Sequence, residues 1–379
     1  MAWLSGWNYR KQITVSSALV DDSLSDFPLT IPVSRTGVES HHGHADGDDI
    51  RFTSSDGTTL LSHIWDGWCD DGHAGAYVGM PAIDATDGAT IYMYYGNASA
   101  SDASDPASVL ADYAIFWPAR NWTSGQLELA NNLAVVSGGG TATGQSDGVR
   151  IGTTWGPLIG ENQSLPTLLE GKSGFTVSCL AKDFSFEDGT YLSIFLTDSS
   201  SSALFCNGSF IKTTGSSSWA FCFYSENINT GFDSGLPATG SQSMHWAFRH
   251  QLQYGANTAK LDVLFDNVSK VSYSRSDTAT SYGAITSSHA LEIGGNVITP
   301  TVVPFTVAEF RVLKEAASDA WLKFEYANLR TAGNQLTFAA EERLATGPYE
   351  VAMLDTFQTD IQQAETYIPG IVAGHTHGI

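Results

Sequence analysis

The chain has 379 residues, enough for two domains of ordinary size, and its 37 glycines and 11% aromatic residues favour a β-rich fold with many turns. Its 18 Lys and Arg residues stand against 40 Asp and Glu residues. The resulting net charge of −22 argues against nucleic acid and anionic membranes as partners. The sequence contains no run of about 18 apolar residues, so we expect no membrane insertion.

Alternating apolar and polar residues predict several short strands in the first 117 residues. Trp7–Val15 alternates, the stretch 48–68 holds two strands joined by a turn at 55–57, and Ile91–Asn97 ends on a Gly-Asn turn. Three motifs lie along these strands, W-N-Y-R-K-Q-I-T-V at 7–15, D-G-D-D-I-R-F-T-S-S-D-G-T-T-L at 46–60 and I-Y-M-Y-Y-G-N at 91–97. In this order they resemble the marks of a small β-domain of bacterial surface and phage proteins, the domain of unknown function DUF2341. The resemblance implies an exposed setting but assigns no chemistry.

A second series of predicted strands follows, led by the apolar stretch 112–120. In the stretch 258–274, Leu261 and Val263 point one way and Asp262 and Leu264 the other. The pair Asp266-Asn267 supplies a hairpin turn within this stretch.

The order of these later strands carries a second resemblance. A W-A-F strand, an L-D-V-L-F-D-N hairpin, an L-E-I-G-G strand and an A-E-F-R-V-L strand follow one another. This order resembles the second half of a laminin-G-like, concanavalin-A-like lectin sandwich. The resemblance implies carbohydrate or protein binding on the concave face or the rim loops, and Ca²⁺ at one rim. No residue of this sequence is identified as a ligand of that Ca²⁺.

The end of the chain departs from the strand pattern. The stretch 318–330 predicts a short helix with Ser318 at its N-cap and with Trp321 and Phe324 on one face. We therefore predict an all-β protein with a small β-sandwich domain in residues 1–117 and a concanavalin-A-like (laminin-G-like) jelly-roll sandwich in residues 118–340. A short, partly helical C-terminal tail, residues 341–379, completes the chain as an oligomerisation or anchoring segment.

Three tryptophans are candidates for a sugar-stacking platform, because an exposed indole can cover the face of a pyranose ring. They are Trp65, Trp68 and Trp122, and core packing is the alternative role for each. The stretch His41–Asp49 gathers side chains that can bind a metal ion. Its alternative is a solvated loop that ends in a turn at Asp46–Asp49.

A glycosidase on this fold would need two carboxylates flanking the sugar bond, at alternate positions of one strand. The sequence has no Glu-x-Asp-x-Glu pattern, and the adjacent pairs Glu187-Asp188 and Glu341-Glu342 would point to opposite faces. It also has no Walker loop and no His-Glu-x-x-His motif. We therefore predict no catalytic residues, and a glycan hydrolase ranks third among the functions considered.

The four cysteines follow no metal-ligand spacing. Three of them lie in strand-like apolar runs, which favours free, buried thiols for the set of Cys69, Cys179, Cys206 and Cys222. A bridge between Cys206 and Cys222 is the alternative.

The C-terminal residues G-H-T-H-G resemble the His-x-His tips of phage tail fibres. His375 and His377 would leave the same face of an extended chain. Three chains on a threefold axis would supply six imidazoles, an octahedral set that suits Fe, Ni or Zn. An anchoring tail without metal and a disordered terminus are the alternatives.

These features together predict a non-catalytic virion structural protein of a tailed phage, namely a fibre, tail-tip or capsid-decorating protein. Its expected partners are a host cell-surface glycan, other virion proteins and further copies of the chain, with a trimer favoured. The sequence opens at Met1 without an export signal, whereas both resembled modules work outside cells. We therefore expect it on the virion, extracellular after release, and the alternative is a bacterial cell-surface adhesin.

Overall fold

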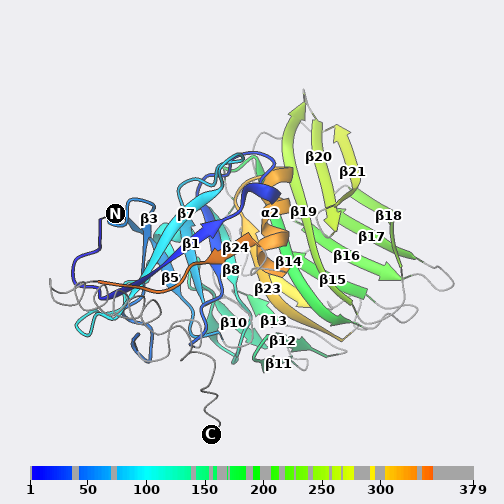
Figure 1. Cartoon of the computed structure of the whole chain (residues 1–379). Helices are drawn as coiled ribbons and strands as arrows, with labels where there is room; N and C mark the ends of the chain where they lie inside the picture. The colour runs from blue at the N-terminus through cyan, green and yellow to red at the C-terminus, as the bar shows by residue number, and fades with distance from the viewer. Residues whose placement is uncertain are drawn as a thin grey trace, which may run out of the picture.

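Figure 1 shows the computed structural model of the chain as two β-rich lobes with a helix between them. The structure describes residues 2–35, 42–69, 75–137, 142–152, 157–159, 169, 171–184, 191–196, 206–212, 218–225, 228–237, 242–255, 258–265, 268–276, 291–294, 304–330 and 335–344.

Two antiparallel sheets build the first lobe. Within the described ranges, the larger sheet has six strands in the order β24-β1-β7-β3-β4, with β25 also beside β1, and the smaller sheet has the order β2-β6-β5. Two short helices belong to this part of the chain, η1 between β1 and β2 and α1 after β7. The bounds are β1 Tyr9–Val15, η1 Ser17–Leu19, β2 Phe27–Ile31, β3 Arg51–Ser54, β4 Leu60–Leu61, β5 His63–Trp65, β6 Ala76–Met80, β7 Ala89–Tyr95, α1 Pro106–Val109, β24 Leu336–Phe338 and β25 Glu342–Arg343.

The alternation along β1 and β7 explains the core of this lobe. Ile13, Ile91 and Met93 point inward and belong to one buried cluster. Arg10 and Tyr92 occupy alternate positions on the opposite face, where the guanidinium carbon of Arg10 lies 4.3 Å from the Tyr92 ring centroid. The predicted strands at 7–15 and 91–97 are therefore present and pair with each other.

The second lobe is a sandwich of two antiparallel sheets, each with eight strands in the part of the chain that is described. One sheet has the order β18-β17-β16-β15-β22-β13-β10-β9. The other has the order β11-β12-β23-β14-β19-β20-β21, with β8 also beside β23. The bounds are β8 Tyr113–Trp117, β9 Gln126–Leu127, β10 Ala134–Ser137, β11 Ala142–Gln145, β12 Gly148–Ile151, β13 Pro157–Ile159, β14 Gly174–Phe184, β15 Tyr191–Leu196, β16 Cys206–Lys212, β17 Ser218–Ser225, β18 Ile228–Pro237, β19 Gln242–Gly255, β20 Thr258–Phe265, β21 Val268–Ser276, β22 Leu291–Gly294 and β23 Phe305–Leu313.

Both faces of β20 are covered, and the predicted alternation explains how. Leu261 and Val263 enter the core between the two sheets of the sandwich. Leu264 points the other way, into the buried cluster that the sandwich shares with the first lobe. Asp262 lies on that same outer side, where it accepts a hydrogen bond of 2.8 Å from Arg249 Nε. The fold class is therefore all-β, as predicted.

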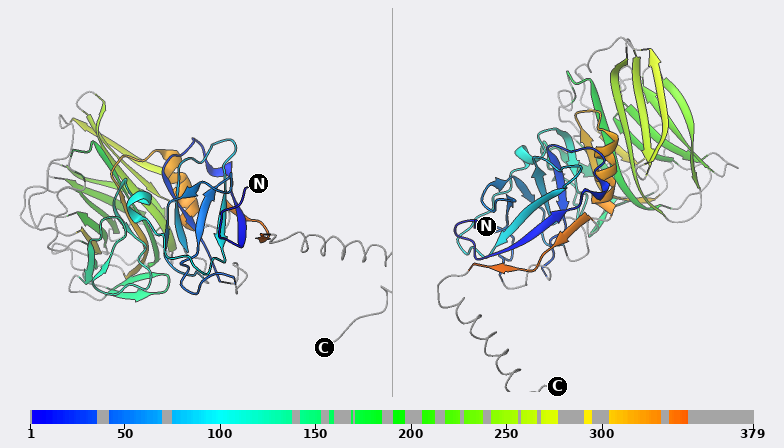
Figure 2. Two further views of the ribbon diagram at one scale, coloured as in Figure 1. Left: turned by 90° about the vertical axis from the view of Figure 1, so that its left-hand side faces the viewer. Right: turned by 45° about the horizontal axis from the view of Figure 1, so that its top comes forward.

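The helix α2, Asp319–Arg330, lies between the lobes in all three views (Figures 1 and 2). Its predicted cap is confirmed, because Ser318 Oγ accepts a hydrogen bond of 3.0 Å from the Trp321 amide. The rings of Trp321 and Phe324 pack on Phe27 of β2, at centroid distances of 4.8 and 5.0 Å. The apolar face of α2 thus joins the first lobe to the outer face of the sandwich.

A buried ion network crosses the same interface. Arg311 of β23, 1% exposed, donates to Glu309 at 2.6 Å, to Glu325 of α2 at 3.2 Å and to Thr30 of β2 at 3.4 Å. Burial raises the pKa of Glu325, but Arg311 and His245 outweigh it and hold that pKa at about 2. The two lobes therefore share charged contacts as well as apolar ones.

The sheets do not follow the expected domain boundaries strand by strand. β8 lies within residues 1–117 but pairs with β23 of the sandwich, which confirms that the stretch 112–120 begins the second series of strands. β24 lies within residues 118–340, and β25 within the expected tail, but both pair with β1 of the first lobe. The chain thus leaves the first lobe, builds the sandwich and returns to complete the first sheet.

The cysteines agree with the expectation of free thiols where their side chains are described. Cys69 and Cys179 are buried, and neither forms a disulfide. In the strand pair β16–β17, Cys222 lies opposite Ser209, not opposite Cys206. This register separates the two cysteines by three positions, roughly 10 Å along the strands, which is too far for a disulfide.

Candidate functional site

Trp122 does not belong to an exposed stacking platform. It is 5% exposed and lies in the core of the sandwich, 6.5 Å from the Trp117 ring centroid. Its indole nitrogen donates a hydrogen bond of 3.1 Å to the Val135 carbonyl oxygen. The prediction of a sugar-binding role is wrong for this residue, because neighbouring core side chains cover the ring that a pyranose would need.

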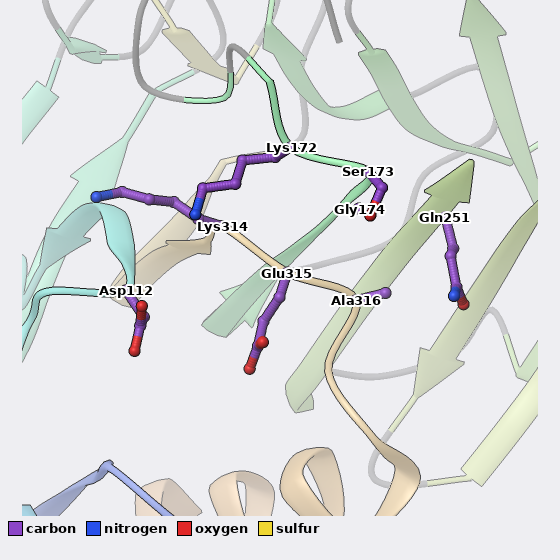
Figure 3. Close-up of a pocket in the computed structure, with 8 residues that line it drawn as sticks. All are labelled: Asp112, Lys172, Ser173, Gly174, Gln251, Lys314, Glu315 and Ala316. Atoms are coloured by element: carbon purple, nitrogen blue, oxygen red, sulfur yellow. The ribbon is translucent and has the colours of Figure 1, made fainter. Parts of the chain in front are cut away.

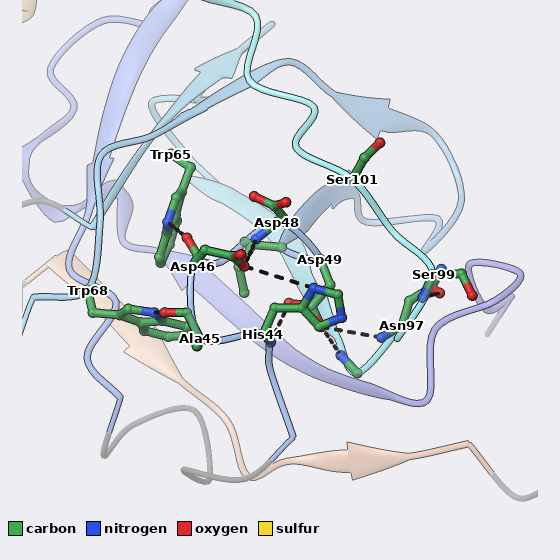
Figure 4. A network of polar contacts seen from close by, with 12 residues as sticks. His44, Ala45, Asp46, Asp48, Asp49, Trp65, Trp68, Asn97, Ser99 and Ser101 are labelled. Carbon is green, nitrogen blue, oxygen red and sulfur yellow. Dashed lines mark hydrogen bonds and ion pairs between the residues drawn. The ribbon is translucent and has the colours of Figure 1, made fainter.

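Trp65 and Trp68 lie together at the surface of the first lobe, with ring centroids 4.9 Å apart (Figure 4). Their indole nitrogens donate to the carbonyl oxygens of Asp46 and Ala45, at 2.6 and 2.7 Å. Gly47, with φ +85°, brings its backbone against Trp65, and a Cβ there would lie 2.2 Å from the ring. The two half-buried indoles therefore hold this loop, and the loop occupies part of the surface that a sugar would use.

The acidic residues of the same loop are engaged by backbone amides. The buried Asp49 carboxylate accepts from the His44 amide at 2.8 Å and from the Gly96 amide at 2.6 Å (Figure 4). Asp46 accepts from the Asp48 amide at 3.2 Å. Within the described ranges, no group of three or more His, Cys, Asp or Glu side chains converges as a metal site would require. The geometry matches that of a turn closed by its own aspartates.

The two tail histidines, His375 and His377, lie outside the described residues, so the metal-bound trimer stays a prediction. Ca²⁺ at a rim of the sandwich also stays a prediction. The hairpin turn at Asp266-Asn267 also falls outside the described ranges, although β20 and β21 pair up to Phe265 and Val268 on either side of it.

A pocket of about 370 Å³ opens at one end of the sandwich, where β14, β19 and β23 meet the segment before β8 (Figure 3). Its volume falls in the range of small-molecule sites, ~300–1,000 Å³. We call it the strand-end pocket, and its lining consists of Asp112, Lys172, Ser173, Gly174, Gln251, Lys314, Glu315 and Ala316.

Backbone contacts fix the shape of the strand-end pocket. The Lys314 amide donates to the Asp112 carbonyl oxygen at 2.8 Å, which ties the exit of β23 to the entry of β8. Thr176 Oγ1 donates to the Glu315 carbonyl oxygen and accepts from the Ala317 amide, both at 2.8 Å. Gly174 allows this segment to approach, because a Cβ there would lie 3.0 Å from Ala316.

Charged groups of both signs line the strand-end pocket. Lys314 Nζ donates to the Ala111 carbonyl oxygen at 3.0 Å, and burial followed by the nearby Lys172 ammonium lowers its pKa. Burial, and then the negative charge of Asp112, raise the pKa of Glu315. In Figure 3 the two lysine side chains extend in one direction and those of Asp112, Glu315 and Gln251 in another. The pocket can therefore offer cationic donors and anionic acceptors to one ligand.

Residues 46–124 match the family model described as "Domain of unknown function (DUF2341)". The DUF2341 domain thus includes the Asp46–Asp49 loop, both surface tryptophans and β8. This confirms that part of the resemblance seen in the sequence. A comparison with curated proteins found no match.

Several solved structures resemble the chain at low identity. They include the binding domain of botulinum neurotoxin serotype C1, with a TM-score of 0.40 and 8% identity, and the ligand-binding domain of serotype D in complex with N-acetylneuraminic acid, with 0.42 and 10%. Each of these two matches covers 58% of this chain and 52% of the neurotoxin chain. Trypanosoma rangeli sialidase with 2,3-difluorosialic acid has a TM-score of 0.38 and 12% identity, over 62% of this chain and 35% of its own. The chain spans about half the length of the neurotoxin structures, and likeness at this level indicates neither ligand nor activity.

Sequence reasoning did not find the strand-end pocket. Its residues come from four segments that are far apart in the chain, and each segment alone reads as an ordinary polar strand end. The one local signal is Gly174, a glycine directly before the apolar run of β14.

Among the described residues, no helix is both long and apolar enough to span a membrane.

Proposed function

We propose that the chain is a non-catalytic protein that binds glycans in the strand-end pocket. The observation that carries the proposal is the pocket itself, an open site on the sandwich lined almost wholly by polar side chains. Sugar hydroxyls both donate and accept hydrogen bonds. Asp112 and Glu315 can accept them, the lysines can donate them, and the Gln251 amide can do both.

The covered face of the sandwich also favours the rim over the broad sheet surface. Ala247 and Leu313, on the outer side of β19 and β23, are buried with Trp321 of α2 in the cluster shared with the first lobe. A glycan therefore cannot lie across these strands near α2. The strand-end pocket lies just beyond that covered area, at the ends of the same strands (Figure 3).

The setting that we propose is the surface of a tailed-phage virion, with a host cell-surface glycan as the ligand. The DUF2341 domain and the high negative charge support an exposed, soluble setting. A bacterial cell-surface adhesin would use the same pocket on a different particle. Detection of the chain in purified virions by mass spectrometry would favour the first setting, and its detection on uninfected cells the second.

The test of binding is a titration of the full chain with polysaccharides extracted from candidate host cells, followed by calorimetry. We expect saturable binding that falls at least ~10-fold in the double variant Asp112→Ala/Gln251→Ala, because two hydrogen-bonding partners are lost. The control is Gln145→Ala, an exposed glutamine on β11 of the same sandwich. Equal affinities of the double variant and the control would place binding elsewhere.

A glycan hydrolase is the second candidate, because the strand-end pocket holds two carboxyl groups, Asp112 and Glu315. The raised pKa of Glu315 suits a general acid, and a neighbouring carboxylate is the usual partner in glycoside hydrolysis. Binding ranks first because Asp112 is exposed and Glu315 is only partly buried, so both carboxyl groups stay open to water, where electrostatic catalysis is weak. Release of reducing ends by the wild type but not by Glu315→Gln would reverse this ranking.

A further inference from the structure

The lysines of the strand-end pocket differ from other lysines of the chain. Lys182, Lys260 and Lys323 each form an ion pair with an aspartate. By contrast, neither Lys172 nor Lys314 has a carboxylate within ion-pair distance among the described residues, although Asp112 and Glu315 line the same pocket. In a chain with a net charge of −22, both lysines of this pocket therefore keep an ammonium group that an anionic group of a ligand can pair with.

The two ammonium groups also act on each other. Lys314 is partly buried, and after that burial the charge of Lys172 is the next cause that lowers its pKa. The two like charges of this lining repel, and the repulsion is reduced when an anion binds near both of them. The hydrogen bond from Lys314 Nζ to the Ala111 carbonyl oxygen keeps this ammonium at the pocket without neutralising it.

The opposite charges limit which anion fits. Asp112 and Glu315 balance the two lysines, so the pocket as a whole carries no excess positive charge. A ligand with several negative charges would be repelled by these carboxylates. A ligand with one anionic group and several hydroxyls matches both parts, because hydroxyls donate to carboxylates.

We propose that the strand-end pocket selects acidic sugars, with one carboxylate or sulfate ester held between Lys172 and Lys314 and the sugar hydroxyls bound by Asp112, Glu315 and Gln251. This selectivity rests on the proposed function, glycan binding in the same pocket. It adds the chemical class of the sugar, which neither the fold nor the DUF2341 match supplies.

The experiment compares three probes on the full chain by ligand-observed NMR titration. They are methyl glucuronide, methyl glucoside 6-sulfate and neutral methyl glucoside. We expect at least one acidic probe to bind ~10-fold or more tightly than the neutral one, since a charge-assisted hydrogen bond is the difference between them. The preference should shrink as salt rises from ~0.05 to ~0.5 M, because the site is open to solvent and its charges are screened.

Two variants locate the effect. Lys172→Met and Lys314→Met keep the length of the side chain and remove its charge, and each should lose the acidic preference while neutral binding changes little. Lys182→Met, which removes a lysine paired with Asp147 outside the pocket, is the matched control and should keep the preference. Unchanged melting temperatures of the variants exclude a folding defect.

The possible failures are distinguishable. Equal binding of the acidic and neutral probes would overturn the acidic-sugar inference and leave glycan binding intact. If neither the three probes nor the host polysaccharides bind, the proposed function itself is overturned. A preference for acidic sugars that survives both lysine substitutions would show that the anion binds at another site, which also overturns the inference.

Discussion

Gly47 is the residue on which the conformation of the Asp46–Asp49 loop depends. Its φ of +85° is unfavourable for any residue with a Cβ, and the Cβ position lies 2.2 Å from the Trp65 ring. The glycine in the D-G-D-D sequence of the DUF2341 domain is thus required for two physical reasons. One is the left-handed backbone and the other is the close contact with an indole.

We predict that Gly47→Ala lowers the free energy of unfolding by about 2 kcal/mol or more, since backbone strain adds to a steric clash. Gly125→Ala is the control, because Gly125 has a similar φ of +94° and nothing within 4 Å of its Cβ position. Urea denaturation of both variants measures the difference. Equal losses would show that the contact with Trp65 contributes nothing.

His63 makes the first lobe sensitive to acid. Burial, followed by the charge of Arg51, lowers its pKa to about 4, whereas an imidazole in an unfolded chain titrates near ~6.5. As the pH falls below ~6.5, the unfolded chain therefore takes up a proton that the folded chain rejects. The folded state is therefore favoured most, as far as His63 is concerned, above pH ~6.5. This part of the free energy of unfolding is lost as the pH falls toward about 4.

The predicted consequence is a fall in the free energy of unfolding between about pH 6.5 and 4 that becomes shallower in His63→Gln. Chemical denaturation at a series of pH values gives both curves. His44→Gln, a substitution in the partly exposed Asp46–Asp49 loop region, is the control for loss of a histidine. Parallel curves for the wild type and His63→Gln would show that His63 is not the source of the acid sensitivity.

At the scale of elements, β23 and α2 are joined by the Arg311 network. Arg311→Met should cost about 3–5 kcal/mol in the free energy of unfolding, because it leaves Glu309 and Glu325 buried without their shared partner. Arg249→Met, which removes a less buried arginine paired with Asp262, should cost less. Denaturant unfolding of both variants tests this, and similar costs would mean that burial of the network has no energetic weight.

The same two elements show what a sequence pattern can predict. The helix at 318–330 was predictable because its cap, its apolar face and its length are local properties. The alternation along β20 was predictable for the same reason. The stretch 112–120 was predicted to begin the sandwich, and β8 does join it, but the partner of a strand is not local, so the five apolar residues of β8 do not indicate that this partner is β23.

The candidate sites follow the same division. The residues of the Asp46–Asp49 loop were found because they are contiguous, but whether a tryptophan is exposed depends on what packs on it. For Trp122 the sequence left both sugar stacking and core packing open, and the structure shows core packing, since its burial comes from strands elsewhere in the sandwich. The strand-end pocket was invisible for the related reason that four distant segments form it, and only the sheet order brings them together.

At the scale of the whole molecule, the return of the chain to the first sheet ties the lobes together. Leu336 of β24 is buried in the shared cluster, and Glu342 of β25 accepts from Arg10 Nε at 2.8 Å. The first lobe, although encoded mostly in residues 1–117, is completed by residues that follow the sandwich.

We predict that removal of residues 335–379 lowers the melting temperature of the first lobe and exposes the edge of β1 to self-association, because an unpaired strand edge invites pairing. Removal of residues 345–379 alone keeps both β24 and β25 and is the matched control. Calorimetry and light scattering of the two truncated chains measure the effects. Identical behaviour would show that β24 and β25 add no stability.

Occupation of the strand-end pocket by a glycan is tested by an experimental structure of the full chain with a bound acidic oligosaccharide. We expect the sugar to lie against Asp112, Gln251 and Lys314, with its anionic group between Lys172 and Lys314. A sugar stacked on Trp65 and Trp68, or lying against any other surface while the strand-end pocket stays empty, would contradict this expectation.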